Sequence, residues 1–236
     1  MPKIAIVAAL EREVSSFIEG STRVARQHEG RTYAFFERNN RKDKDKDRRD
    51  RHNENDERNE LVIVCGGIGV EAARRAAEAV IALYRPTLLQ SVGFAGALHA
   101  GLHVGDVFTP AVVIDARDGS RVEIEGANRQ GTLVTFMAVA GIDQKANLAR
   151  AYGANAVDME ASAVAAAARA HGIPFAATKA ISDEYDFEMP QTGSFINSQG
   201  QFRTAGFATL FTLPAATKLV EPSIKLADFT EMLSNA

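Results

Sequence analysis

The most constraining feature of the chain is a strand–helix–strand pattern between Glu60 and Leu98. ELVIVCGGIG is apolar on both alternating faces, as in a parallel strand that helices cover on each side. VEAARRAAEAVIALY then carries one apolar and one charged stripe at helical spacing, and Pro86 ends the pattern. TLLQSVGFAGAL returns to strand character. The unit predicts an α/β fold.

The flanking segments extend the same alternation. KIAIVAAL, RTYAFFE, GTLVTF and PFAATKAIS are expected to form strands, and DVFTPAVVIDARD is expected to form strands with a hairpin turn at Asp118-Gly119. Helices are predicted from Gln144 to Tyr152 and from about Asp158 to the glycine at 172. Nearer the end of the chain we expect a turn at 197–200, a helix over 204–213 and a last helix opened by Pro222.

Length and composition are those of an ordinary globular protein. At 236 residues the chain is expected to form a single domain over residues 1–236. A net charge of −3 offers no general field for holding nucleic acid. Cys65 has no intrachain disulfide partner, and the sequence carries neither a signal-peptide pattern nor an apolar run that could span a bilayer. We therefore expect a cytoplasmic protein without stable membrane insertion.

One segment, from Arg38 to Glu60, contains no apolar residue. Such a segment cannot bury enough surface to offset the entropy of ordering it, so we expect a disordered polar insert at about residues 38–60. Its basic and acidic residues nearly cancel, which favours a solvated loop over an electrostatic docking arm.

Acidic residues from distant parts of the chain follow the predicted strands. Glu13 lies after the first strand, Glu160 opens a late helix, and Asp183 follows AIS. Ligands of open α/β sheets bind where the carboxyl ends of the strands meet, so these three carboxylates are candidate site residues. Each also has a simpler interpretation, as a first-turn acid or a helix N-cap.

Two further patterns are weaker. GGIGVEA has glycines between a strand and a helix, but the third small residue of a dinucleotide fingerprint falls at Ala72, and the next strand lacks the terminal acid, so a nicotinamide site is disfavoured. We see no requirement for a metal or an organic cofactor.

Together the motifs resemble a known family. KIAIVAALEREV, LVIVCGGIGVEAA, SVGFAGAL with a following VGD, VDMEASAV and AISD stand in the order and spacing of the nucleoside phosphorylase and nucleosidase superfamily. The positions that bear the mechanism resemble the methylthioadenosine/S-adenosylhomocysteine nucleosidases, whereas FINSQGQFRTAGF looks more like the hopanoid-associated phosphorylase-like branch. The resemblance covers about Lys3 to Asp183 apart from the insert. It implies a central mixed β-sheet flanked by helices and a homo-oligomer, dimeric or larger.

The resemblance also implies roles for single residues. Glu160 with Met159 matches the pair that binds the ribose hydroxyls, Asp183 matches the acid at N7 of the purine, and Glu13 matches the residue that takes a proton from the attacking water. Asp183 would then have to hold a proton near neutral pH, which favours an apolar pocket with Phe94, Met159 and Phe136 in its lining. The expected base pocket comprises Phe94, Ala95, Gly96, Val139, Ala140 and Ser182.

The sequence accordingly predicts an enzyme that hydrolyses a purine nucleoside, a small-molecule partner, and releases adenine. Three alternatives stay open. The first is a phosphate-dependent phosphorylase, with phosphate as co-substrate and Arg12 as its candidate ligand. The second is a nucleosidase for adenosylhopane, approached along Phe207, Leu210 and Phe211. The third is a non-catalytic nucleoside-binding module in which Phe94 blocks the nucleophile.

Overall fold

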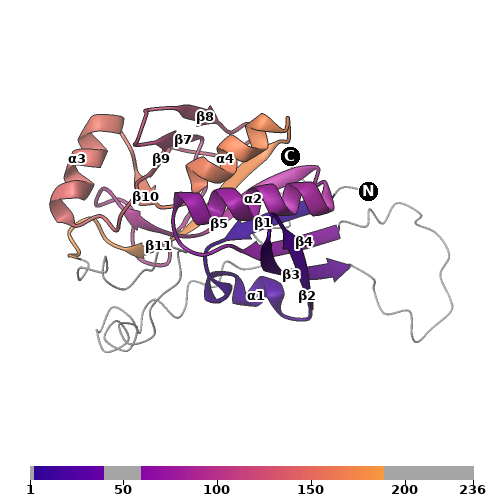
Figure 1. Ribbon diagram of the computed structural model, residues 1–236. Helices are drawn as coiled ribbons and strands as arrows, with labels where there is room; N and C mark the ends of the chain where they lie inside the picture. Colours follow the sequence, from indigo (N-terminus) through magenta and orange to yellow (C-terminus); the bar gives the residue numbers. More distant parts are fainter. Residues whose placement is uncertain (1–2, 40–59, 189–236) are drawn as a thin grey trace, which may run out of the picture.

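A computed structural model describes residues 3–39 and 60–188 of the chain (Figure 1). The strands are β1 (Lys3–Ala8), β2 (Thr22–His28), β3 (Arg31–Asn39), β4 (Glu60–Cys65), β5 (Leu88–Ala97), β6 (Val107–Phe108), β7 (Val112–Asp115), β8 (Arg121–Glu123), β9 (Thr132–Thr135), β10 (Ala156–Asp158) and β11 (Phe175–Asp183). The helices are the 3₁₀ turn η1 (Glu11–Val14), α1 (Ser15–Ile18), α2 (Val70–Tyr84), α3 (Ile142–Tyr152) and α4 (Ala161–Ala170).

These strands form one mixed sheet, so the predicted α/β class is confirmed. Its order is β2-β3-β4-β1-β5-β10-β9-β7-β8, with β11 paired to β5 and β6 paired to β11. β4, β1, β5 and β11 run parallel to their neighbours in that series, whereas β3 joins β4 in antiparallel orientation. Because the carboxyl ends of the four parallel strands meet at one edge, the loops that follow them share that edge.

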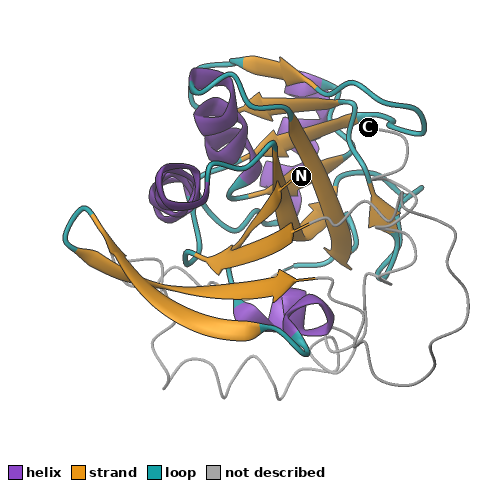
Figure 2. Cartoon of the chain, turned by 90° about the vertical axis from the view of Figure 1, so that its right-hand side faces the viewer, coloured by secondary structure: helices purple, strands orange, loops and turns teal. Residues whose placement is uncertain are grey.

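Helices cover both faces of the parallel strands, as the sequence pattern requires (Figures 1 and 2). Ala5 and Val7 of β1 point into a core shared with α2 and α4, where alanines allow the two helices to approach the sheet closely. Ile4 and Ile6 point the other way, into a core closed by Val14 and Phe17 of η1 and α1. Both faces of β1 are thus buried, which explains its uninterrupted apolar sequence.

Most predicted elements are found, with shifts at their ends. α2 begins and ends where its amphipathic pattern does, and β7 and β8 form the hairpin around Asp118-Gly119. The helix predicted from about Asp158 begins only at Ala161. Asp158 instead ends β10, because that strand pairs with β9, and its carboxylate accepts a hydrogen bond from the Ala161 N–H at 2.8 Å.

Three residues of the predicted polar insert belong to strands. Arg38 pairs with Leu61 and Asn39 with Glu60, so that Arg38 and Asn39 belong to β3 and Glu60 belongs to β4. Backbone pairing with an apolar strand keeps these polar residues in the sheet. The rest of the insert, residues 40–59, lies outside the described residues, as do the turn and helices predicted beyond residue 188. In the described part of the chain, no helix has both the length and the apolar character needed to cross a bilayer.

Candidate active site

β5 lies against the candidate site, since two of its glycines, Gly93 and Gly96, are close to the carboxylates of predicted site residues. A Cβ atom at Gly93 would stand 3.0 Å from Glu13 Oε2, and one at Gly96 would stand 2.8 Å from Asp183 Oδ2. A side chain at either position would therefore press on a carboxylate. The glycines of SVGFAGAL allow Glu13 and Asp183 to rest against the same strand, three residues apart.

Glu13 reaches β5 from η1, the turn that directly follows β1. Its Oε2 accepts hydrogen bonds from the backbone N–H groups of Ala9 at 3.0 Å and Leu10 at 3.2 Å. Burial raises the pKa of Glu13 above its ordinary value, although the Lys179 ammonium and the two backbone donors oppose that rise. The carboxylate is thus held in one orientation by the chain's own backbone.

Glu160 is the N-cap residue of α4. The sequence had predicted that it lies inside the helix, because the helix was expected to begin near Asp158. Its Oε1 accepts a hydrogen bond from the Gly69 N–H at 2.8 Å, and Oε2 accepts one from the Met159 N–H at 3.3 Å. Burial, with the neighbouring Asp158 carboxylate as the next cause, raises the pKa of Glu160 to about 8. The backbone of the glycine-rich turn before α2 therefore donates a hydrogen bond to a carboxylate of the protein, that of Glu160.

A buried lysine lies among these carboxylates. Lys179 of β11 is 1% exposed, and its Nζ lies 2.8 Å from Asp158 Oδ2 and donates to Ser91 Oγ at 3.1 Å. Burial alone would lower the pKa of Lys179, but Asp158, Glu160 and Glu13 together raise it above its ordinary value. The Lys179 ammonium is thus the buried positive charge that Glu13, Glu160 and Asp158 have in common.

Asp183 is the last residue of β11 and is 7% exposed. Its Oδ2 lies 2.5 Å from Nζ of the buried Lys145, and the Ser182 hydroxyl lies 2.5 Å from its Oδ1 and 3.2 Å from the carbonyl oxygen of Ala95. The groups that contact the Asp183 carboxylate are polar, which differs from the expected apolar surroundings. Asp183 has an ammonium partner because an unpaired carboxylate at this depth would be costly.

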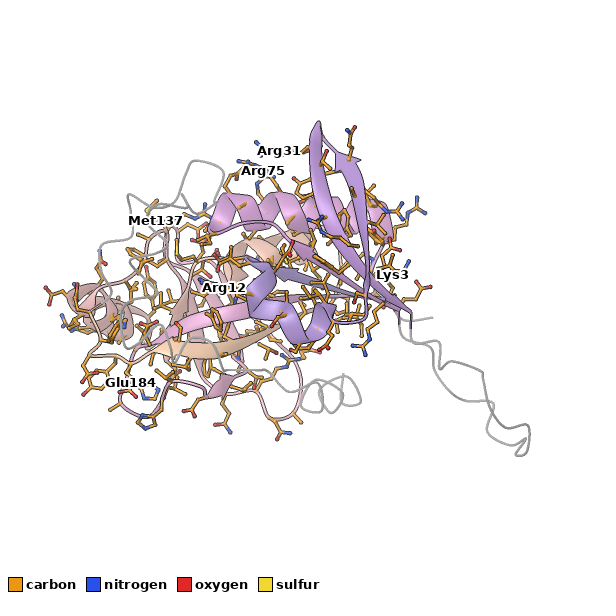
Figure 3. All side chains as sticks on the ribbon, turned by 90° about the horizontal axis from the view of Figure 1, so that it is seen from below. Lys3, Arg12, Arg31, Arg75, Met137 and Glu184 are labelled. Atoms are coloured by element: carbon orange, nitrogen blue, oxygen red, sulfur yellow. The ribbon has the colours of Figure 1, made fainter. Side chains whose placement is uncertain are left out.

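The remaining predicted positions lie around this edge of the sheet. Phe94 is half-buried and packs against the core beneath η1 and α1, and Ala140 is buried beneath α3. Val139, next to Ala140, is half-buried, and Arg12 lies on η1 with its side chain exposed (Figure 3). The assigned roles of these four residues in binding a base or phosphate stay predictions.

Sequence reasoning missed both buried lysines, although each left a signal. Lys145 stands three residues before Leu148, on the stripe of α3 that faces the core, and Lys179 interrupts the apolar run FAATKAIS. A lysine at a position that calls for an apolar side chain is almost always paired when buried. Lys145 pairs with Asp183, and Lys179 pairs with Asp158.

A mixed α/β sheet with buried carboxylates at its parallel strand ends is the arrangement expected of the nucleosidase and nucleoside phosphorylase class, whose members are enzymes that act on N-glycosidic bonds. The chain belongs to the phosphorylase superfamily, whose family profile matches residues 3–140 and 130–209. The resemblance inferred from the motifs is thereby confirmed, as is the prediction that the protein is an enzyme.

Solved structures share the fold. A methylthioadenosine/S-adenosylhomocysteine nucleosidase from Campylobacter jejuni matches with a TM-score of 0.69 at 17% identity, over 99% of each chain. The futalosine hydrolase of Helicobacter pylori matches with a TM-score of 0.65 at 18% identity, over 99% of this chain and 97% of its own. An S-adenosylhomocysteine nucleosidase from Streptococcus pyogenes matches with a TM-score of 0.61 at 24% identity, over 78% of this chain and 86% of its own.

Proposed function

We propose that this protein hydrolyses the N-glycosidic bond of a purine nucleoside and releases adenine. In this reaction a water oxygen bonds to C1′ of the ribose, and the bond from C1′ to the base nitrogen breaks. The electron pair of that bond leaves with the base, the water gives up a proton, and the base takes one up. Positive charge grows on the sugar and negative charge on the base, so carboxylates beside the sugar and a proton source beside the base lower the barrier.

The observation that carries the proposal is the state of Glu13. Two backbone N–H groups bind Oε2, so within the described residues Oε1 keeps its lone pairs for a water. Burial raises the pKa of Glu13, and a carboxylate of raised pKa is the stronger general base. These are the properties that proton removal from an attacking water requires.

Glu160 and Asp183 complete the assignment. Each oxygen of Glu160 accepts one backbone hydrogen bond, and in the carboxylate form, which gains population as the pH approaches its pKa of about 8, each retains acceptor capacity for a ribose hydroxyl. Asp183 of β11 lies against Gly96, three residues beyond Gly93 on β5, on the side that we assign to the base. With the Lys145 ammonium as its partner, it acts as a carboxylate that accepts a hydrogen bond from the proton taken up by the base. Similar folds named as nucleosidases and a hydrolase support water as the nucleophile.

The test is base release from methylthioadenosine, S-adenosylhomocysteine, adenosine and inosine, measured with and without phosphate. We expect phosphate-independent release of adenine. Formation of ribose 1-phosphate only when phosphate is present would replace hydrolysis by phosphorolysis, and tight nucleoside binding without release would make the protein a binding module. Glu13→Gln should lower kcat about 100-fold or more, whereas Glu11→Gln, two residues away and exposed, should not.

We propose further that the enzyme needs no metal or organic cofactor and works as a cytoplasmic homo-oligomer. Activity that survives exhaustive chelation, and a solution mass of at least two chains by light scattering, are the expected results. A single-chain mass in an active preparation would contradict the second part.

A further inference from the structure

Lys145 is a buried cation that takes no direct part in the proposed reaction. It lies in the first turn and a half of α3, is 1% exposed, and directs its ammonium at Asp183 Oδ2, 2.5 Å away. The same Nζ donates to the carbonyl oxygens of Glu184 at 2.6 Å and Phe187 at 3.2 Å. A lysine ammonium has three N–H donors, so all three have an acceptor within the protein.

The segment after β11 is joined to α3 at a second point. The Ile142 N–H, at the start of α3, donates to Glu188 Oε2 at 2.9 Å, where the carboxylate also offsets the unpaired N–H groups of the helix end. Residues 184–188 are therefore held at both ends by the first turns of α3. Asp183 lies at the point where this segment leaves the sheet.

We propose that Lys145 is a positioning residue for base release: its ammonium fixes the Asp183 carboxylate and fastens residues 184–188 to α3. The assignment rests on the proposed function, in which Asp183 faces the base. Lys145 acts through Asp183 and does not touch the substrate, because its three donors are already used. Charge-assisted hydrogen bonds of this kind are short and directional, so they fix a side chain more firmly than neutral contacts do.

A methionine tests the ammonium while it keeps the length and apolar stem of the side chain. In Lys145→Met we expect kcat for base release to fall about 100-fold, the loss that a displacement of about 1 Å at a catalytic group produces. KM should rise much less, since the Glu160 contacts are untouched. Arg150→Met, on the exposed side of the same helix, is the matched control and should keep both constants. A folded Lys145→Met protein with kcat within twofold of the wild type would overturn the proposal.

Chemical rescue separates positioning by an ammonium from mere support of the fold. Lys145→Ala opens space for a small amine, and ethylammonium chloride should restore kcat in a saturable manner. Tetramethylammonium chloride, which has no N–H donor, should not. Absence of rescue in a folded protein would count against the proposal. If Lys145→Ala does not fold, Lys145→Gln decides, because its amide can donate to Asp183 and should leave kcat above that of Lys145→Met.

Hydrogen exchange supplies a readout that does not depend on turnover. The amides of Ile142 and of residues 184–188 should exchange faster in Lys145→Met than in the wild type, and unchanged exchange would refute the fastening. A wild-type protein that releases no base from any nucleoside would overturn the proposed function and this role with it. An active wild type with an unimpaired Lys145→Met would overturn the role of Lys145 alone.

Discussion

Single residues set the charge balance of the site. Glu13, Glu160 and Asp158 share one buried cation, the Lys179 ammonium, so each carboxylate responds to the protonation of the others. The site therefore works as a coupled group in which a change at Lys179 reaches both glutamates, although Lys179 hydrogen-bonds to Ser91 and Asp158 and to neither of them.

Lys179→Gln tests this coupling through the pH dependence of kcat/KM. The Lys179 charge lowers the pKa of Glu13 and of Glu160, so its removal lets both values rise. The carboxylate forms then appear only at higher pH. The acidic limb of the plot of kcat/KM against pH should therefore shift to higher pH by about one unit. Arg12, the other cation beside Glu13, is unchanged in this variant and lowers the same pKa. Lys179→Arg keeps the charge and should keep the limb in place; equal profiles in both variants would contradict the coupling.

Glu160→Gln tests the raised pKa through stability. Glu160 ionises near its ordinary value of 4.5 in the unfolded chain but keeps its proton to about pH 8 in the folded protein. The stability gained is complete below pH 4.5 and has been lost once the pH has risen through 8, because between these values the folded state holds a proton that the unfolded state has released. Glutamine resembles the protonated acid, so we expect Tm to rise by about 3 °C at pH 9 and to stay equal at pH 4. Glu125→Gln, at an exposed position, controls for the loss of charge; a Tm gain equal at both pH values would argue against a raised pKa.

Among the elements, β5 contacts the site at the largest number of its positions, and its sequence is correspondingly constrained. Ser91 binds Lys179, Gly93 adjoins Glu13, and Gly96 adjoins Asp183, while the residues between them enter the core. A strand normally disfavours glycine, because glycine packs nothing and is flexible when unfolded. Its presence twice within four residues reflects the close approach of two carboxylates.

Gly96→Ala tests that close approach. The new methyl group would lie 2.8 Å from Asp183 Oδ2, inside contact distance, and Asp183 cannot swing away freely because Lys145 and Ser182 hold it. We expect kcat to fall about 10-fold to 100-fold and Tm to fall by several °C, because a buried ion pair has to shift to accommodate the methyl group. Thr109→Ala, at a half-buried position outside the site, is the control. Unaltered kcat in Gly96→Ala would show that Asp183 is not held against β5 during turnover.

The elements also show what sequence alone can predict. Strands buried on both faces and the amphipathic α2 were readable, because their patterns reflect local surroundings. β2 was missed, since TRVARQH is largely exposed and owes its strand form to pairing with β3. The sequence placed Glu13 and Asp183 correctly at the ends of strands and Glu160 near the start of a helix, although Glu160 proved to be the N-cap. The buried lysines were not found, because the pairs Lys145–Asp183 and Lys179–Asp158 join residues 38 and 21 positions apart that only the folded sheet brings together.

At the scale of the whole molecule, the two described residues that flank the insert, Asn39 and Glu60, pair with each other at the end of β4 away from the site. Glu13, Gly69 and Asp183 follow or end parallel strands, whereas the insert enters β4 at its first residue, Glu60. Glu60 lies beside Lys3, the first residue of β1, and the two side chains form an ion pair of 3.0 Å. The six residues of β4, at about 3.3 Å each, separate Glu60 from the edge of the sheet at which the site lies.

Replacement of residues 40–59 by Asn-Gly should therefore leave kcat and KM within twofold of the wild type. Asn39 and Glu60 are direct partners in an antiparallel pair, and a two-residue Asn-Gly turn joins such partners without distortion. A shorter connection also costs less entropy on folding, so Tm should stay equal or rise by a few °C, measured by calorimetry. A Gly/Ser segment of the natural length is the control, because it removes the charges and keeps the length. If both variants melt normally but lose base release, the charged residues of the insert act on the substrate or its approach; loss in the Asn-Gly variant alone would show that the reach of the insert matters.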